Sequence, residues 1–505
     1  MNEVLRTDLL DHGMNAGKEQ KVFELLRAWR AGAVLVGREQ WRLFFEKGTI
    51  NKNHRNEREL ALAHVVGAAN RLQMVRYQVV GILHSHMANR QNDFSRLVEC
   101  STLPNEVRHQ LHFVNRWRAW FGREPLSMKG GAEIPDETRR LARQIMRRVL
   151  SRHRKPDFSG INMVIDRRAA KLMEAEDATE FDLWIRLSTM TPNQPIEIPL
   201  RAHRYFQGRP GMRKQTVQVN ERDGRLFFGV VTNMADACEG QKESYRPRCE
   251  EIGLDYGLRT LFATDQGDLL GQGFLRQIGI YDRRISGLAA YRQKHGLRTR
   301  SPRYDRYVRQ VRGFLRTEIG RVLNRLVEIQ RPARIVVEKL YFRNPNLSRR
   351  MNRLVTNAGR RIIEEKLTDL HEQFGIEVVH VNPAYSSQTC SACDYVDKKN
   401  RTGETFHCGW CGRTLHADVN ASRNLRARRS RPAVGSVKQA KAAVLRAQVL
   451  EFQRLSMERW GNPKGRRGTS RDPREQNAYF RRYAPEVTSI GTSATSALAA
   501  CAIGP

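Results

Sequence analysis

The feature that most constrains this 505-residue chain is a group of four cysteines. They form two C-x2-C pairs with fourteen residues between them, Cys390 with Cys393 and Cys408 with Cys411. This spacing is typical of a tetrahedral zinc site built on two knuckles, and two accidental pairs so close together are improbable. Four thiolates leave no open coordination position, so we predict one structural Zn²⁺ rather than a catalytic one. His407 and His416 flank the quartet and are not needed as ligands.

The charge of the chain indicates a polyanionic partner. There are 88 Lys and Arg against 53 Asp and Glu, a formal net charge of +35. Nucleic acid is the commonest partner of such a protein, with a ribosome-associated or basic membrane-surface protein as alternatives. The N-terminus does not read as a signal peptide, and no apolar run approaches the ~20 residues that span a bilayer. We therefore expect a soluble intracellular protein that has no membrane partner.

The periodicity of apolar residues and the local composition change along the chain. Residues 17–155 show helical spacing of apolar side chains, whereas 162–233 contain short β-branched runs separated by Gly, Pro and Asp turns, typical of a small antiparallel β domain. From residue 249 strands alternate with long helical stretches, which predicts a partly parallel sheet covered by helices. After residue 426 the chain is rich in Arg, Gly, Ser and Pro. There we expect a largely disordered tail, with one helix over 437–460.

Two basic features of the helical region have alternative interpretations. Phe113, Trp117, Trp120 and Phe121 have arginines between them and could stack on bases, but a core-facing stripe is the better interpretation. Leu141, Ile145 and Val149 form another apolar stripe surrounded by arginines. The arginine face could follow a phosphate backbone or be a solvated surface.

Three acidic residues occupy positions where a carboxylate needs a compensating charge. Asp255 ends the strand run GLDYG, Glu338 ends the buried run RIVVE, and Asp418 lies at the start of a helix in HADVNASRNL. If they converge, they would bind two Mg²⁺ ions and support in-line phosphodiester hydrolysis. Singly, each acid could instead be a turn residue, a salt-bridged strand residue or a helix cap. The zinc knuckles lie between the second and third acids, beside the predicted active site.

These stretches together resemble the TnpB nucleases of transposons and the miniature type V CRISPR effectors. The resemblance rests on GLDYGLRTLFATDQGDLLG, RIVVEKLYF, and a block in which SSQ-x-CSxC, a second CxxC and ADxNAxxN follow in order, and it covers roughly residues 251–426. It departs from the family in Lys339, Leu340 and Tyr341 after the second acid, and in His416 two positions before the third. Neither departure removes a predicted metal ligand.

The resemblance implies a multidomain α+β and α/β fold. It would combine a helical recognition lobe, a small β-barrel-like wedge domain and an RNase H-like RuvC nuclease domain with an inserted zinc ribbon. The implied boundaries are 1–17 for the N-terminal wedge strand, 18–160 for the recognition lobe, 161–248 for the wedge domain, 249–389 for the first part of the RuvC domain with a basic helical insertion at 274–330, 390–411 for the target nucleic-acid-binding ribbon, 412–429 for the last part of the RuvC domain, and 430–505 for the tail.

The resemblance also implies an RNA-guided DNA endonuclease with guide RNA and target double-stranded DNA as partners. Its single RuvC site would comprise Asp255, Glu338 and Asp418, and its location would be the prokaryotic cytoplasm, with the nucleoid when targeting. Two alternatives stay open: an RNA-guided DNA-binding silencer with weak cleavage, and a RuvC-like resolvase that acts without RNA. CRISPR or transposon origin, and one or two copies per RNA, also stay open.

Overall fold

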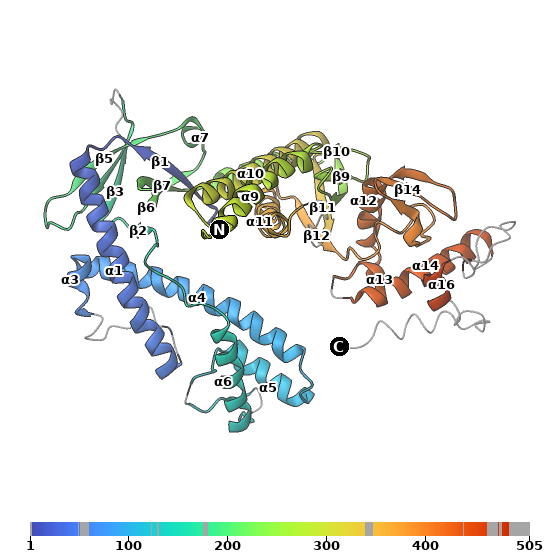
Figure 1. Cartoon of the computed structure of the whole chain (residues 1–505), viewed down its shortest axis with the longest axis horizontal. Helices are drawn as coiled ribbons and strands as arrows, with labels where there is room; N and C mark the ends of the chain where they lie inside the picture. Colours follow the sequence, from blue (N-terminus) through green and yellow to red (C-terminus); the bar gives the residue numbers. More distant parts are fainter. Residues whose placement is uncertain are drawn as a thin grey trace. The chain divides into compact units, whose positions relative to one another are not determined.

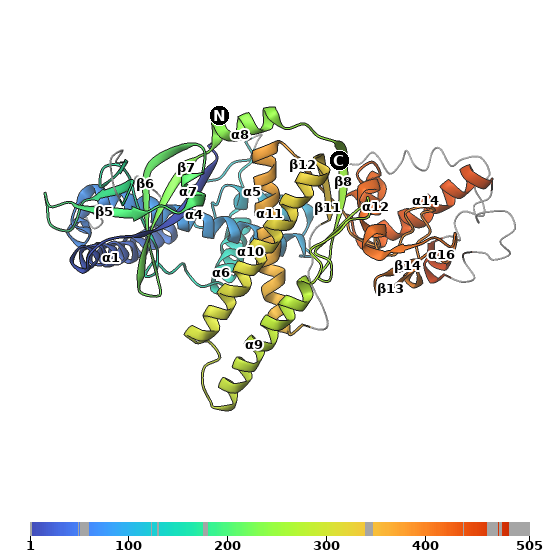
Figure 2. The same ribbon diagram turned by 90° about the horizontal axis from the view of Figure 1, so that it is seen from above.

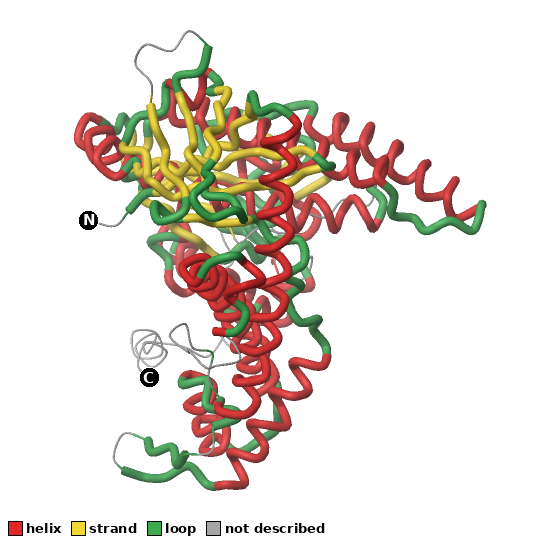
Figure 3. Tube along the Cα trace, turned by 90° about the vertical axis from the view of Figure 1, so that its left-hand side faces the viewer, coloured by secondary structure: helices red, strands yellow, loops and turns green. Residues whose placement is uncertain are grey.

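The computed structural model shows the chain as two compact units, Met1–Ala237 and Cys238–Pro505 (Figure 1). Each unit mixes helices with a β-sheet. Figure 3 colours the helices and strands of the chain separately. The residues that the structure describes are 3–48, 50, 60–122, 124–128, 131–174, 180–338, 347–437, 439–461, 473 and 477–483.

The predicted helical region of the first unit is confirmed. Its first helix, α1, begins after Asn15, whose side chain accepts a hydrogen bond from the Lys18 N–H, and ends at Gly48 in the left-handed conformation that glycine tolerates. The apolar positions that follow helical spacing, Val22 to Trp29, are buried in the core. The helices of this unit are α1 Ala16–Lys47, α3 Ala63–Val66, α4 Ala69–Glu99, α5 Asn105–Arg116, α6 Asp136–Ser151 and α7 Arg204–Gln207.

The aromatic set after α5 divides between core and surface. Helix α5 ends at Arg116, so the set does not lie on one continuous helix. Trp120 and Phe121 are 1% and 5% exposed and pack edge-on against Phe44, as the core interpretation predicts. Trp117 is 64% exposed, and the core interpretation is wrong for this residue because the helix stops before it.

The β region of the first unit forms a seven-stranded sheet of order β2-β6-β7-β1-β5-β4-β3. The N-terminal strand β1 lies inside it, antiparallel to both β5 and β7. The two ends of the sheet approach one another, since the backbone N–H of Leu172 on β3 donates to the side chain of Gln215 on β6 at 2.9 Å, so the sheet is nearly a closed barrel. Its strands are β1 Leu5–His12, β2 Met163–Ile165, β3 Ala170–Glu174, β4 Leu183–Leu187, β5 Ile196–Arg201, β6 Met212–Arg222 and β7 Arg225–Asn233.

The second unit contains a five-stranded sheet of order β10-β9-β8-β11-β12. Strands β8, β11 and β12 are parallel, and β9 and β10 are antiparallel additions at one edge. Figure 2 shows α9, α10 and α11 side by side, with the strands beyond them. The first elements of this part of the chain are α8 Ala235–Ser244, β8 Cys249–Tyr256, β9 Phe262–Thr264, β10 Leu269–Leu270, α9 Phe274–Lys294, α10 Pro302–Gln330, β11 Pro332–Glu338, α11 Arg349–Phe374 and β12 Glu377–Val381.

Alternation along the strands separates the two faces of this sheet. Ile252, Leu254, Ile335 and Val337 point into the core that α9, α10 and α11 cover. The intervening Val336 packs instead against Val381 and Leu425, the latter from α12. Because side chains alternate along a strand, Asp255 and Glu338 belong to the α12 face.

The remaining elements are the zinc-knuckle region, α12 and the helices that follow it. They are the 3₁₀ turn Lys398–Asn400, β13 Arg401–Thr402, β14 Thr405–His407, β15 Thr414–His416, α12 Ala417–Arg428, α13 Pro432–Gly435, α14 Lys441–Trp460 and α16 Ala478–Tyr483. The helix expected over 437–460 is therefore confirmed as α14. The structure adds the short helices α13 and α16, and Leu445, Val449, Phe452 and Phe480 form an apolar face that is buried against the cysteine region. The expectation of disorder in the rest of the tail falls on residues 462–472, 474–476 and 484–505, which lie outside the described residues. None of the described helices is both long and apolar enough to cross a lipid bilayer.

Candidate active site and metal centre

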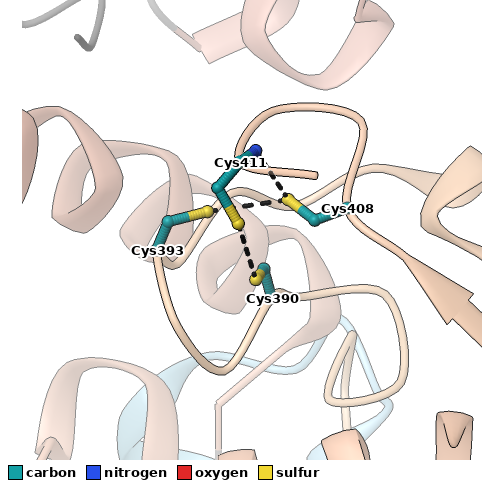
Figure 4. Close-up of side chains that lie close together, drawn as sticks. All are labelled: Cys390, Cys393, Cys408 and Cys411. Atoms are coloured by element: carbon teal, nitrogen blue, oxygen red, sulfur yellow. Dashed lines mark hydrogen bonds between the residues drawn. The ribbon is translucent and has the colours of Figure 1, made fainter. Parts of the chain in front are cut away.

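The four predicted cysteines lie together at the tips of two knuckles (Figure 4). Their sulfur atoms all lie within 4.8 Å of one another, with Cys390 to Cys411 at 3.7 Å and Cys393 to Cys408 at 3.6 Å. A tetrahedron of Zn–S bonds of about 2.3 Å has edges of about 3.8 Å, so this cluster fits one Zn²⁺. The Cys411 N–H points to the Cys408 sulfur at 3.4 Å, which stabilises a thiolate there. Three of the cysteines are buried and Cys411 is exposed.

Two asparagines of the ADxNAxxN motif attach the first knuckle to α12. Asn420 donates to the Thr389 carbonyl at 2.7 Å and accepts the Ser391 N–H at 3.0 Å. Asn424 donates to the carbonyls of Ser386 and Thr389, both at 2.7 Å. Both amides are buried, so replacing either leaves polar groups without partners. The two asparagines of the motif therefore have a structural role. They fix the position of the first knuckle relative to α12, the helix that carries Asp418.

The three predicted carboxylates come from β8, β11 and α12. In the parallel pairing of β8 with β11, Val337 lies opposite Leu254, which makes Glu338 the neighbour of Asp255. Helix α12 packs on the same face, with Asp418 in its first turn. Asp255 and Asp418 are each 7% exposed. Among the described residues only the cysteines form a group whose ligand atoms all lie within 4.8 Å, so the carboxylates are neighbours with a wider spacing.

One glycine allows α12 to approach the sheet closely, and a second fits the tight turn after β8 beside Asp418. A Cβ atom on Gly253 would lie 2.2 Å from the Ser422 carbonyl oxygen, where only glycine fits. A Cβ on Gly257 would lie 2.6 Å from the Thr260 carbonyl oxygen and 3.5 Å from a carboxylate oxygen of Asp418. The G-L-D-Y-G sequence thus places Asp255 between two positions without side chains, in contact range of the helix.

Burial and mutual repulsion shift the protonation of the carboxylates. Burial, then the charges of Glu338 and Asp418, raise the pKa of Asp255 well above its ordinary value. Burial also raises the pKa of Glu338 to about 7, against the lowering effect of the Arg428 charge. Close, buried acids of this kind hold protons until a cation replaces them, which is the electrostatic condition of a divalent metal site.

Arg401 of the knuckle region reaches this site. Its guanidinium donates to Asp418 at 2.9 Å, and its charge lowers the pKa of both Asp255 and Glu338. The sequence did not single out Arg401, because one arginine among 88 basic residues gives no signal. The short strand β13 is what directs it to the carboxylates.

His416, one of the departures from the family pattern, caps α12. Its ring nitrogen Nδ1 accepts the Asp418 N–H at 3.3 Å, which is the role that an aspartate performs at a helix start. His407 is a surface residue that interacts with Thr414. The departures after Glu338, Lys339 to Tyr341, lie outside the described residues.

The helices after α12 cover the first knuckle. Arg431 forms an ion pair with buried Asp394 at 2.6 Å, and Asn477 donates to the Val396 carbonyl at 2.7 Å. The Tyr395 ring stacks on Phe480, with ring centroids 5.2 Å apart. Trp410, Phe452 and Phe480 surround the same ring. The tail is thus part of the core that contains three of the cysteines.

Comparison with known proteins agrees with the resemblance seen in the sequence. A family described as Cas12f1-like, TNB domain matches residues 361–425, which contain the cysteines and Asp418. A CRISPR-associated endodeoxyribonuclease Cas12f1 of Sulfoacidibacillus thermotolerans is 41% identical over 64 residues, 12% of this chain and 15% of the relative. The putative RNA-guided DNA endonuclease InsQ of Escherichia coli is 25% identical over 368 residues, 59% of this chain and 90% of that protein.

The matches to the Cas12f1 relatives are local. Two of them align with only 15% and 10% of their own lengths. Among solved structures, a Cas12f1–sgRNA–target DNA complex aligns with 84% of this chain and 99% of its own, at 12% identity and a TM-score of 0.39. The chain is therefore similar to TnpB-like proteins and to Cas12f1 nucleases, and the similarity is strongest in the cysteine-containing block.

Proposed function

We propose that the protein is an RNA-guided DNA endonuclease with one RuvC-type active site formed by Asp255, Glu338 and Asp418. The observation that carries this proposal is the placement of three acids from β8, β11 and α12 on one face of the sheet, where burial raises the pKa of Asp255 and Glu338. The names of the relatives, CRISPR-associated endodeoxyribonuclease and putative RNA-guided DNA endonuclease, support the same activity.

The three carboxylates are the residues that would hold two Mg²⁺ ions. Bound there, the ions would supply an activated water and stabilise the leaving oxygen of the phosphodiester. Asp255 and Glu338 are fixed by neighbouring strands, so their separation changes little, whereas Asp418 and Arg401 depend on α12 and the knuckles. Arg401 brings a positive charge to a site that must accept a phosphate, which favours the extra negative charge of the transition state.

We also propose the domain assignment implied by the resemblance. The β-rich part of the first unit, including β1, would be the wedge domain and its long helices the recognition lobe. In the second unit, the five-stranded sheet with α9 to α12 would be the RuvC domain, and the Cys390–Cys411 region its inserted zinc ribbon. Guide RNA and target double-stranded DNA would then bind to a protein whose net charge of +35 attracts polyanions.

Cleavage by matched variants tests the active site. Asp255→Ala should abolish metal-dependent DNA cleavage and leave RNA and DNA binding largely intact. Glu250→Ala is the matched control, because it removes an exposed carboxylate from the same strand β8. Undiminished cleavage by Asp255→Ala would show that the acids are not the active site.

The RNA that accompanies the protein tests guidance. Protein purified from its native host should carry one structured RNA species with a variable end of ~20 nucleotides. Replacing that variable segment should redirect cleavage to the matching DNA. Cleavage that is independent of this segment would favour a RuvC-like resolvase instead.

A further inference from the structure

The arginines in the two halves of helix α10 differ in their ion pairing. In the second half, Arg321 pairs with Glu318 at 2.6 Å and Arg325 with Glu328 at 3.5 Å, each three residues away. In the first half, Arg306 and Arg312 have no acidic residue three or four positions away on either side. Within the described part of the chain neither forms an ion pair, and both are exposed. The second half of α10 therefore pairs exposed arginines within the helix, whereas Arg306 and Arg312 of the first half have no such partner.

The surrounding segment carries a large excess of positive charge. Residues 274–316, which the structure describes without a gap, contain twelve Arg and Lys and two acids. One acid, Asp282, is buried and accepts hydrogen bonds from Ser348, and the other, Asp305, pairs with Arg300. Neither acid is available to neutralise Arg306 or Arg312.

Neighbouring helices add to this basic surface. Arg303 donates to the Tyr307 hydroxyl, and this hydrogen bond, with the charges of Arg303, Arg306 and Arg284 of α9, lowers the pKa of Tyr307. Arg350 of α11 lies over the Tyr304 ring at 5.6 Å. In Figure 2, α9 and the first half of α10 extend past the strands of their own unit, so this surface belongs to a projecting helical hairpin.

The chemistry of the surface specifies the kind of ligand. Arginines recur at every third or fourth position from Arg303 to Arg316, about 20 Å along the helix axis. Proteins that bind single strands use exposed aromatic side chains as stacking platforms, but Tyr304, Tyr307 and Phe314 in this stretch are half-buried. Tyr291 of α9 is exposed, but its ring lies against His295. Because α10 presents no exposed ring between Arg303 and Arg316, its guanidinium groups favour phosphate contacts along a double helix, where the bases are hidden.

We propose that the first half of α10, with Arg306 and Arg312 at its centre, binds the phosphate backbone of double-stranded nucleic acid without reading its sequence. The inference rests on the proposed function for the nature of the polyanion. It adds a backbone-binding surface on the helical hairpin, outside the carboxylate site.

Two double variants of the same helix test the proposal. Arg306→Gln with Arg312→Gln removes two charges from the proposed surface, and Arg321→Gln with Arg325→Gln removes two from the paired half. Full-length zinc-loaded protein, freed of nucleic acid at high salt, is titrated with a 30-base-pair DNA duplex and with a single strand of equal length at several salt concentrations, without divalent metal.

The first double variant should bind the duplex about tenfold more weakly, and its salt dependence should be less steep by about two phosphate contacts. The control variant should match the parent. Equal losses in both variants, or no loss in either, would overturn the proposal. If the double variant loses as much affinity for the single strand as for the duplex, the assignment to a double helix is overturned.

The outcome is separable from the proposed nuclease activity, because binding is measured without metal and cleavage in a second assay. If the parent does not cleave DNA but the first variant loses duplex binding, the surface is supported and the nuclease proposal fails. If the parent cleaves and the salt dependence is unchanged, the surface alone is rejected.

Discussion

Arg401 connects the zinc region to the acids at the scale of single residues. Its positive charge lowers the pKa of Asp255 and Glu338, so it favours the ionised carboxylates that a metal requires. We predict that Arg401→Gln raises both pKa values and shifts the acid limb of the cleavage profile to higher pH. The loss of rate should be about tenfold or more at pH 6.5 and smaller at pH 8.5.

The control for this prediction is Arg413→Gln, which removes an exposed arginine between Cys411 and β15. A structural role of Arg401 would reduce cleavage by the same factor at every pH, so the pH profile separates the two. A profile parallel to that of the parent would contradict an electrostatic role.

Glu338 gives a prediction for stability, because burial raises its pKa from 4.5 to about 7. The pKa of Glu338 is higher in the folded protein than in the unfolded chain, so its protonated form stabilises the fold. This stabilisation is complete at pH values below the unfolded-state pKa of 4.5. It is lost as the pH rises through about 7. Without divalent metal, the melting temperature should therefore fall between about pH 4.5 and pH 7 more in the parent than in Glu338→Gln. Mg²⁺ should stabilise the parent more at pH 8 than at pH 5, which thermal unfolding with and without Mg²⁺ would measure.

The sequence located the acids but not their surroundings. Asp255 and Glu338 were predicted at strand ends, and the structure places them there, because an acid after a buried apolar run is visible in the pattern. Gly253 and Arg401 were not identified, since their roles depend on the close approach of α12 and on the path of β13. The binding of Mg²⁺ by Asp255, Glu338 and Asp418 stays a prediction.

At the scale of elements, the C-terminal helices support the first knuckle. Phe480 of α16 is 1% exposed and stacks on Tyr395, two residues after Cys393, which we predict to be a zinc ligand. We predict that Phe480→Ala, which removes a buried ring worth about 3 kcal/mol, loosens the knuckle. Zinc release to a coloured chelator should be at least about tenfold faster than in the parent.

Met457→Ala on α14 is the control, because that side chain is 48% exposed on the same group of helices. Equal release from the parent and Phe480→Ala would show that the tail does not stabilise the metal centre. The tail was expected to be largely disordered because its Arg, Gly and Ser content resembles that of unfolded segments. The few apolar residues that pack on the ribbon are too widely separated to give a periodic signal.

Long periodic elements were predicted more successfully than short ones. The helices that became α10 and α11 and the strands β8, β11 and β12 follow clear apolar patterns. The basic helical stretch expected over 274–330 consists of two helices, α9 and α10, with a break between Lys294 and Pro302. The break follows from Gly296 in the left-handed conformation and the Ser301 cap before Pro302, local signals weaker than the long-range periodicity.

For the whole molecule, the division into two units predicts a local effect of zinc removal. The cysteine cluster shares its core with α14 and α16 and attaches to α12, all within Cys238–Pro505. The seven-stranded sheet of the first unit has a separate core. Removing zinc eliminates the bonds that hold the two knuckles together, so only elements packed on them should lose stability.

Hydrogen–deuterium exchange of the full chain, with and without a zinc chelator, measures this. Exchange should rise by an order of magnitude or more in 386–425 and in 441–460, and should change little in β1, β6 and β7. Because α12 carries Asp418, cleavage should be lost together with protection of 417–428, and both should return when zinc is restored. A uniform rise across both units would show that the chain unfolds as one body. Unchanged exchange in α12 would mean that zinc does not position the third carboxylate.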